Sequence, residues 1–181
     1  MWIRWISLIA IVLSSHVVLS QRNNDIQLAN EYYSTGELDK AREIYEQVIQ
    51  NPRAIPLVHN NYLMILLDQE EFDEADKYLR KTIKLVPGNI EYQLDIGLVY
   101  LRRGDQEKAD DYFNKFIDYY KQDIYKTRIA AQYFVNKRLT SYAIAAFKSG
   151  REAMGNPNMF ALEMANLYRI SGEKEQMVEE Y

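Results

Sequence analysis

The 181-residue sequence contains no cysteine and only two histidines, His16 and His59. The absence of cysteine excludes disulfide bonds, cysteine–zinc sites, thiol nucleophiles and lipidation of an N-terminal cysteine. A lone histidine is much more often a solvent-facing side chain than a ligand, so His59 does not indicate a metal site. We therefore expect the chain to hold neither a metal nor a cofactor.

The sequence also lacks the short motifs of common enzyme classes. It contains no HExxH, no GxSxG and no glycine-rich loop that would hold a phosphate group. The acidic stretch EEFDEADKY, Glu70–Tyr78, lacks the glycine and the alternating oxygen ligands of a calcium loop. It is typical of a solvated helix start, where acidic side chains interact favourably with the helix dipole. We expect no enzymatic activity.

Clustered positive charge is absent as well. The formal net charge is −4, and the sequence has no concentration of Lys and Arg of the kind that DNA or RNA binding requires. Hydrophobic residues make up 48% of the chain and charged residues 27%, which is typical of a globular protein rather than a disordered one. The composition therefore favours a folded protein without a nucleic-acid partner.

The only long apolar stretch lies in the first twenty residues, MWIRWISLIAIVLSSHVVLS. Arg4 precedes an apolar run from Ile6 to Leu13, which is too short to span a membrane, since spanning requires about 20 residues. This pattern predicts a signal peptide over residues 1–20, with cleavage near Ser20–Gln21. An uncleaved signal anchor is the alternative and the only expected route to a membrane. Both alternatives place the remaining chain outside the cytoplasm, in the periplasm or cell envelope of a bacterium.

Small and turn-forming residues recur with a period of 34 residues. A fixed period of this length indicates stacked copies of one structural unit. Each small residue in the second half of a repeat is followed four positions later by a large apolar residue; these positions are Ala41, Ala75, Ala109 and Ala143. Twelve residues earlier lie Ala29, Leu63, Gly97 and Ala131, and five residues earlier lie Gly36, Glu70, Gly104, Arg138 and, in the next repeat, Gly172. The period predicts that every copy folds in the same way.

The repeats resemble the tetratricopeptide repeat family, most closely in the segment IGLVYLRRGDQEKADDYFNKF. Leu63, Glu70 and Arg138 depart from the family pattern but keep its register. The resemblance implies an all-α fold, a right-handed α-solenoid of antiparallel helix pairs. It implies repeat units at 22–55, 56–89, 90–123, 124–157 and 158–181. The fifth unit is incomplete and has no polar capping helix, so we expect the chain to be the N-terminal piece of a longer protein.

Apolar residues at i, i+3, i+4 and i+7 divide each repeat into two helices. We expect helices at Asn24–Thr35 and Leu38–Gln50, Pro56–Gln69 and Phe72–Leu85, Asn89–Arg103 and Asp105–Tyr120, Ile124–Lys137 and Leu139–Ala153, and Asn158–Ser171 and Glu173 onward. We expect Gly97 to lie where two helices cross, opposite the small Ala109. Gly104 is expected in the turn between them, where glycine tolerates a positive φ.

In the family, the first helix of each unit lines the concave face of the solenoid, and this implies a partner-binding groove. The groove residues that we expect from helical geometry are Tyr33, Met64, Leu67, Leu94, Leu98, Leu101 and Arg128, flanked by Ile26, Asn30, Asn60, Gln132, Val135, Leu162, Asn166 and Arg169. Its apolar middle would suit a helix or an extended peptide. The alternative is that another part of the same protein fills the groove.

Some family members grip a C-terminal carboxylate with two asparagines and several basic residues. Asn30 and Asn61 match the asparagine places, but Ile26, Glu91 and Asp95 occupy the basic ones, so we do not expect this clamp. The prediction is a non-catalytic scaffold in the bacterial envelope that binds another protein or peptide. A sensory or regulatory region of a longer membrane signalling protein is the alternative, and repeats that serve a downstream enzyme domain are a third. Changing Leu94 and Leu98 to Asp should abolish partner capture and preserve helicity.

Overall fold

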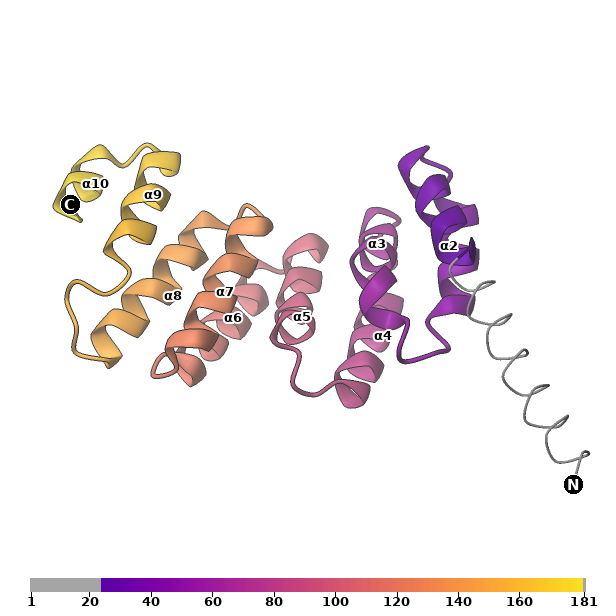
Figure 1. Ribbon diagram of the computed structural model, residues 1–181, viewed down its shortest axis with the longest axis horizontal. Coiled ribbons are helices and arrows are strands. Elements are labelled where there is room, and N and C mark those ends of the chain that lie inside the picture. Colours follow the sequence, from indigo (N-terminus) through magenta and orange to yellow (C-terminus); the bar gives the residue numbers. More distant parts are fainter. Residues whose placement is uncertain (1–23, 181) are drawn as a thin grey trace, which may run out of the picture. The chain divides into compact units, whose positions relative to one another are not determined.

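The computed structural model describes residues 24–180, and this part of the chain consists of helices joined by short turns, without a strand (Figure 1). The predicted leader, residues 1–20, lies outside the described residues. A helix over residues 24–34 is followed by α2 (Leu38–Val48), α3 (Ile55–Asp68), α4 (Phe72–Leu85), α5 (Ile90–Arg103), α6 (Gln106–Tyr120), α7 (Ile124–Asn136), α8 (Thr140–Ala153), α9 (Ala161–Ser171) and α10 (Lys174–Glu179). These bounds confirm the expected alternation of paired helices.

The helices form two compact units, of which the first ends at Ala75 and the second begins at Asp76, within α4. In the first unit α2 packs against α3. In the second unit α5 pairs with α6, α7 with α8, and α9 with α10. Successive pairs stack there, because α5 also packs against α7 and α6 against α8. This is the expected all-α solenoid architecture, in which each pair buries the open face of its neighbour.

The turns within the five pairs share one backbone conformation. The residues five positions before Ala41, Ala75, Ala109, Ala143 and Met177 are all left-handed, with φ of 79° at Gly36, 59° at Glu70, 85° at Gly104, 60° at Arg138 and 83° at Gly172. The following residue donates its N–H to a carbonyl five positions back, as from Asp105 to Tyr100 (3.0 Å) and from Leu139 to Phe134 (2.8 Å). These bonds cap the free carbonyls at the helix end. The register therefore survives where the repeat has lost its glycine, as expected.

Arg138 and Glu70 hold a conformation that costs a residue with a β-carbon roughly 1–2 kcal/mol. We expect Arg138→Gly to raise the free energy of unfolding by about 0.5–1 kcal/mol, because glycine removes this cost but adds unfolded-state entropy. Urea denaturation followed by circular dichroism measures the change. Arg138→Ala is the matched control, since it removes the long side chain but keeps the β-carbon. Equal stability of the Gly and Ala variants would contradict the backbone explanation.

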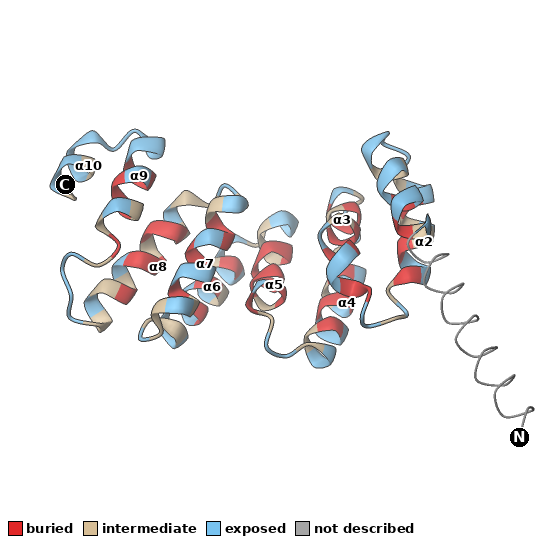
Figure 2. Cartoon of the chain, viewed as in Figure 1, coloured by how far each residue is buried: buried red, intermediate tan, exposed pale blue. Residues whose placement is uncertain are grey.

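The alanines of the repeat are core residues. Ala29, Ala41, Ala75, Ala109 and Ala143 are fully buried, as their period predicts. Figure 2 shows buried positions recurring along the helices, whereas the short α10 has none. In the second unit one apolar core joins residues of α5 to α9, among them Leu94, Phe113, Phe134 and Met164. Small residues at the alanine positions allow the helices of this core to approach closely.

Gly97 also lies at a close approach, but its neighbour is not the one that we expected. A β-carbon at Gly97 would lie 2.3 Å from Cε1 and 2.7 Å from Cζ of Phe113. The ring of Phe113, rather than the small Ala109, covers the glycine. The helical period placed Phe113 beside the crossing, but did not show that its ring turns over the α5 backbone.

The fifth pair begins later than expected. Its first helix starts at Ala161 rather than Asn158, and Phe160 before it is left-handed, with φ of 63°. Phe160 is buried, and its ring centroid lies 4.7 Å from that of Phe147 in α8. The packing of this ring outweighs the backbone preference of Phe160. Helix propensity alone does not predict such a contact.

Candidate protein-interaction surface

The structure divides the expected groove residues by burial. Leu67, Leu94 and Leu98 are 1%, 0% and 6% exposed, so they are core residues rather than an open apolar surface. Tyr33, Met64 and Leu101 are partly buried, and Arg128 is exposed. The expectation of a free apolar middle at these leucines is therefore wrong. For Leu94 the reason is the stacking of α5 on α7, which places Leu94 in one core with residues of the next pair.

The flanking residues follow the same division. Ile26 is buried and Val135 is partly buried, whereas Asn30, Asn60, Gln132, Leu162, Asn166 and Arg169 are exposed. The exposed groove residues on α7 and α9 all belong to the second unit and lie beside further exposed side chains of these helices. A groove that joins the first and the second unit stays a prediction.

Four large hydrophobic side chains are exposed on α7 and α9, two on each helix. Tyr125 and Ile129 on α7 are 78% and 43% exposed, and Leu162 and Ile170 on α9 are 65% and 63% exposed. The residues on each helix are four or eight positions apart, which places them on one side of it. By contrast, α8 carries no exposed large hydrophobic residue. Tyr125, Ile129 and Ile170 were not among the expected groove residues, although Tyr125 and Ile129 lie one turn before Arg128 and directly after it.

An arginine links the two helices beside these apolar side chains. Nη2 of Arg128 lies 3.0 Å from Oε1 of Glu163 in α9, and its guanidinium lies 5.4 Å from the ring centroid of Phe160. Gln132 on α7 donates to Oδ1 of Asn136 (2.9 Å). Arg169 on α9 is exposed and has no ion pair within residues 24–180. The surface is therefore mixed, with apolar anchors and an excess of positive charge.

Three of the residues at the places of a carboxylate clamp, Asn30, Asn61 and Asp95, have structural partners. In the first unit, the hydroxyl of Tyr45 donates to Oδ1 of Asn30 (2.6 Å), and Nδ2 of Asn61 donates to the same oxygen (3.1 Å). In the second unit, Asp95 is buried and accepts a hydrogen bond from the Tyr133 hydroxyl (2.8 Å). Burial and the nearby Asp95 raise the pKa of Tyr133 well above its ordinary value. Asp95 thus joins α5 to α7, and its carboxylate is a contact within the core.

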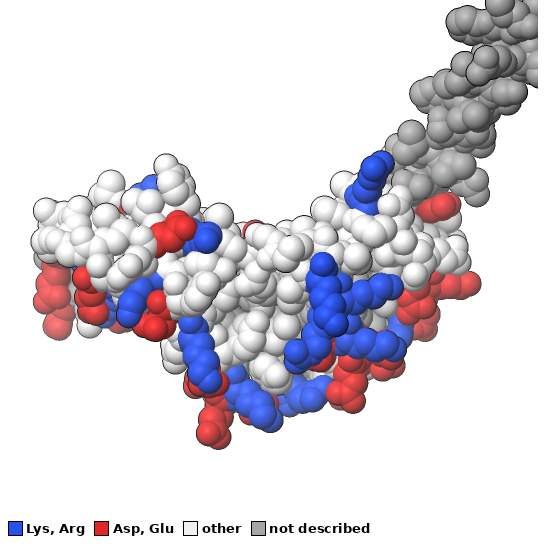
Figure 3. Space-filling model, turned by 90° about the horizontal axis from the view of Figure 1, so that it is seen from below, with Lys and Arg blue, Asp and Glu red and all other residues white. Residues whose placement is uncertain are grey.

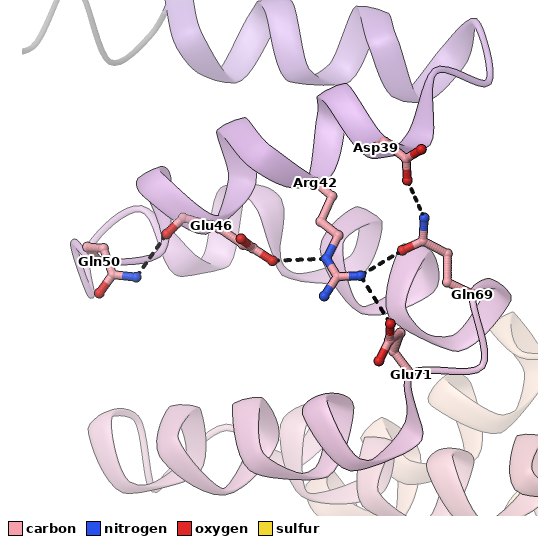
Figure 4. A network of polar contacts seen from close by, with 6 residues as sticks. All are labelled: Asp39, Arg42, Glu46, Gln50, Gln69 and Glu71. Atoms are coloured by element: carbon pink, nitrogen blue, oxygen red, sulfur yellow. Dashed lines mark hydrogen bonds and ion pairs between the residues drawn. The ribbon is translucent and has the colours of Figure 1, made fainter.

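A polar network supports the first unit (Figure 4). Arg42 of α2 donates from Nε to Glu46 (2.9 Å) and from Nη1 to Oε1 of Gln69 (3.0 Å), and it lies 3.6 Å from Glu71. Nε2 of Gln69 donates in turn to Asp39 (2.8 Å). The network ties α2 to the turn after α3, so its charged side chains serve packing between helices.

Several basic side chains elsewhere are paired with acidic ones. On the face drawn in Figure 3, Lys and Arg gather in one place, and Asp and Glu lie at its edge. Several of the ion pairs lie within one helix, as between Arg80 and Asp76 (2.6 Å) and between Lys115 and Asp111 (2.7 Å). Exposed pairs of this kind neutralise charge locally and contribute little to stability, about 0.3–0.5 kcal/mol each. The absence of a nucleic-acid partner stays a prediction.

Within the described range, no three His, Cys, Asp or Glu side chains are grouped so that they could hold a metal ion. In the same part of the chain, no helix combines the length and apolar character needed to cross a membrane.

Comparison with solved structures finds similar folds at low sequence identity. The structure of MamA RS-1, an ArsTM double mutant, is similar with a TM-score of 0.46 and 11% identity, over 88% of this chain and 89% of that chain. A structure of MamA AMB-1 has a TM-score of 0.42 and 16% identity, over 88% of this chain and 87% of that chain. No curated protein sequence matches this chain significantly.

Family comparison agrees with the helix pairs and the shared turns. Models of the tetratricopeptide repeat match residues 26–53, 58–89 and 91–123, which together make up more than half of the chain. The matched segments correspond to the first three pairs, and the later pairs repeat the same turn geometry at Arg138 and Gly172. This chain belongs to the tetratricopeptide repeat family.

Proposed function

We propose that this chain is a non-catalytic scaffold that binds a peptide or helix of another protein along the first helices of its repeats. Tetratricopeptide repeats generally mediate protein–protein interaction, which supports a protein partner. The observation that carries the proposal is the set of large hydrophobic side chains exposed on α7 and α9. Exposed apolar residues that lie together on a folded surface commonly mark a contact site.

The stacking of helix pairs buries some apolar residues of the first helices and leaves others exposed. Leu94 and Leu98 on α5 show that apolar side chains on a first helix are buried where the protein packs against itself. Tyr125, Ile129 and Leu162 keep much of their surface exposed in spite of this packing. A partner helix would bury them by the same contacts that join neighbouring pairs, and recognition of a helix by an apolar surface is a recurring binding mode.

Partner capture tests the proposal with two exposed positions as a matched pair. Leu162→Ser should remove proteins that the unchanged chain retains from an envelope extract of its native host, as identified by mass spectrometry. Tyr119→Ser is the control, because Tyr119 is 79% exposed on the second helix α6. Both variants should keep the helical circular dichroism spectrum. An identical set of retained proteins for both variants would place the contact elsewhere.

We also propose that the chain acts outside the cytoplasm, in the bacterial periplasm or envelope. The apolar leader with Arg4 supports this location. Expression with the leader, cell fractionation and mass spectrometry of the N-terminus test the proposal. Cleavage near Ser20–Gln21 is expected, whereas an intact leader in the membrane fraction would indicate the signal anchor. Recovery of the intact chain from the cytoplasm would contradict both.

The second candidate function is a sensory or regulatory region of a longer membrane signalling protein. The same exposed surface on α7 and α9 would then contact another part of that protein. Sequencing of the complete coding region distinguishes the two candidates. A transmembrane segment or a kinase-like domain after Tyr181 would favour the signalling protein.

A further inference from the structure

We infer that the surface of α7 and α9 binds a peptide segment that carries both acidic and large apolar residues. This α7/α9 surface consists of Tyr125, Arg128, Ile129, Leu162, Arg169 and Ile170. The inference rests on the proposed function and specifies the chemistry of the partner.

Charge on the two helices favours an acidic ligand. α7 carries Lys126 and Arg128, and Lys126 is paired with Asp123, the residue that caps the start of the helix (3.5 Å). Arg128 and Arg169 on this surface therefore stand against the single carboxylate of Glu163. On α9, Arg169 is exposed and has no ion pair inside the described range. Glu163, also on α9, already pairs with Arg128. An acidic segment would meet an excess of positive charge here, although the chain as a whole carries a formal charge of −4. Complementary charge of this kind selects partners and speeds their encounter.

Arg128 is held in place before a ligand arrives. Its guanidinium lies over the Phe160 ring and contacts Glu163, while its side chain remains 55% exposed. Arginine presents its donors in a fixed fork that matches the two oxygens of a carboxylate. An exposed ion pair contributes little, so a ligand carboxylate can compete with Glu163 at low cost. Arg169 offers a second site without this competition.

The apolar side chains require more than charge from the ligand. Tyr125 and Ile129 are one turn apart on α7, and Leu162 and Ile170 are about two turns apart on α9. Burial of these side chains is favourable when an apolar group of the partner covers them. Tyrosine and arginine are also the residue types most enriched among residues that dominate binding energy. The favoured ligand therefore combines carboxylates with leucine-like or aromatic side chains.

A displayed library of random peptides, selected against the purified chain, tests this inference. We expect enriched peptides to carry Asp or Glu close to Leu, Ile or Phe. A fluorescent copy of the most enriched peptide should bind at least about tenfold more weakly to Arg169→Glu, because the variant replaces attraction by repulsion. Its affinity should also fall as NaCl rises from about 0.05 to about 0.5 M, because salt screens exposed charges.

Two further variants control for charge and folding. Arg169→Lys should bind within about threefold of the unchanged chain if positive charge dominates recognition there. Lys115→Glu makes the same charge reversal on α6, where Lys115 is 76% exposed, and should leave affinity unchanged. Circular dichroism should show equal helicity in all variants.

The possible failures are distinguishable. Enriched peptides without acidic residues, or equal affinity for Arg169→Glu and the unchanged chain, would overturn the inference and leave the scaffold function standing. A selection that enriches no peptide above the display background would overturn the proposed peptide-binding function, and the inference with it.

Discussion

Replacing Leu94 with Asp is expected to destroy the core of the second unit, lowering the free energy of unfolding by at least about 4 kcal/mol. Leu94 is completely buried and shares a core with Phe113, Phe134 and Met164. The substitution both empties the space of a leucine and places a carboxylate among apolar side chains. Because domains are stable by only about 5–15 kcal/mol, most of the margin would be lost. Urea denaturation followed by circular dichroism measures the change.

Leu162→Asp is the matched control for Leu94→Asp. Leu162 is 65% exposed on α9, so the same chemical change should alter stability by no more than about 0.5 kcal/mol. The sequence had suggested that changing Leu94 and Leu98 to Asp would abolish partner capture and preserve helicity. The buried position of Leu94 reverses that expectation. If Leu94→Asp unfolds at the same urea concentration as the unchanged chain, Leu94 does not belong to the core.

Leu94 also shows what sequence periodicity does and does not predict here. The 34-residue period predicts the helix pairs and their turns, because every pair must satisfy the same backbone hydrogen bonds. Even Glu70 and Arg138 adopt the left-handed turn conformation that the period assigns to glycine. The period of a single helix, however, identifies only the side that faces its own partner. It does not reveal which of the other sides the next pair covers.

The proposed interaction surface depends on these contacts between neighbouring pairs. Leu94 is covered by packing between α5 and the next pair, whereas Leu162 on α9 remains exposed. Tyr125 and Ile129 lie outside the positions of α7 that the period assigns to the groove, namely Arg128, Gln132 and Val135. Such differences arise from the curvature and spacing of neighbouring helices, which a repeat pattern does not encode.

Gly97→Ala is expected to lower the free energy of unfolding, although alanine is the better helix former. Alanine gains about 1 kcal/mol in helix propensity over glycine. Its β-carbon, however, would lie 2.3 Å from Cε1 of Phe113, and overpacking of a close-packed core costs typically about 1–3 kcal/mol. Gly97→Val, with two more carbons in the same space, should be less stable still. Urea denaturation of both variants tests this order.

The Phe113 ring has little freedom to move away. It is fully buried, and its centroid lies 5.0 Å from that of Phe134 and 4.8 Å from that of Tyr142. If the clash with this ring is the cause, shortening the side chain should relieve it. The double variant Gly97→Ala/Phe113→Leu should therefore lose less free energy of unfolding than the two single variants lose together, by at least about 0.5 kcal/mol.

Gly88 provides the control for the change from glycine to alanine. A β-carbon at Gly88 meets no atom within 4 Å. Gly88→Ala should therefore leave stability unchanged or raise it by up to about 1 kcal/mol, by restricting the unfolded chain. A loss of stability at Gly97 but not at Gly88, together with rescue by Phe113→Leu, would identify close packing as the reason for glycine within α5. Equal stability of Gly97→Ala and the unchanged chain would show instead that the cost of close packing is no larger than the gain of about 1 kcal/mol in helix propensity.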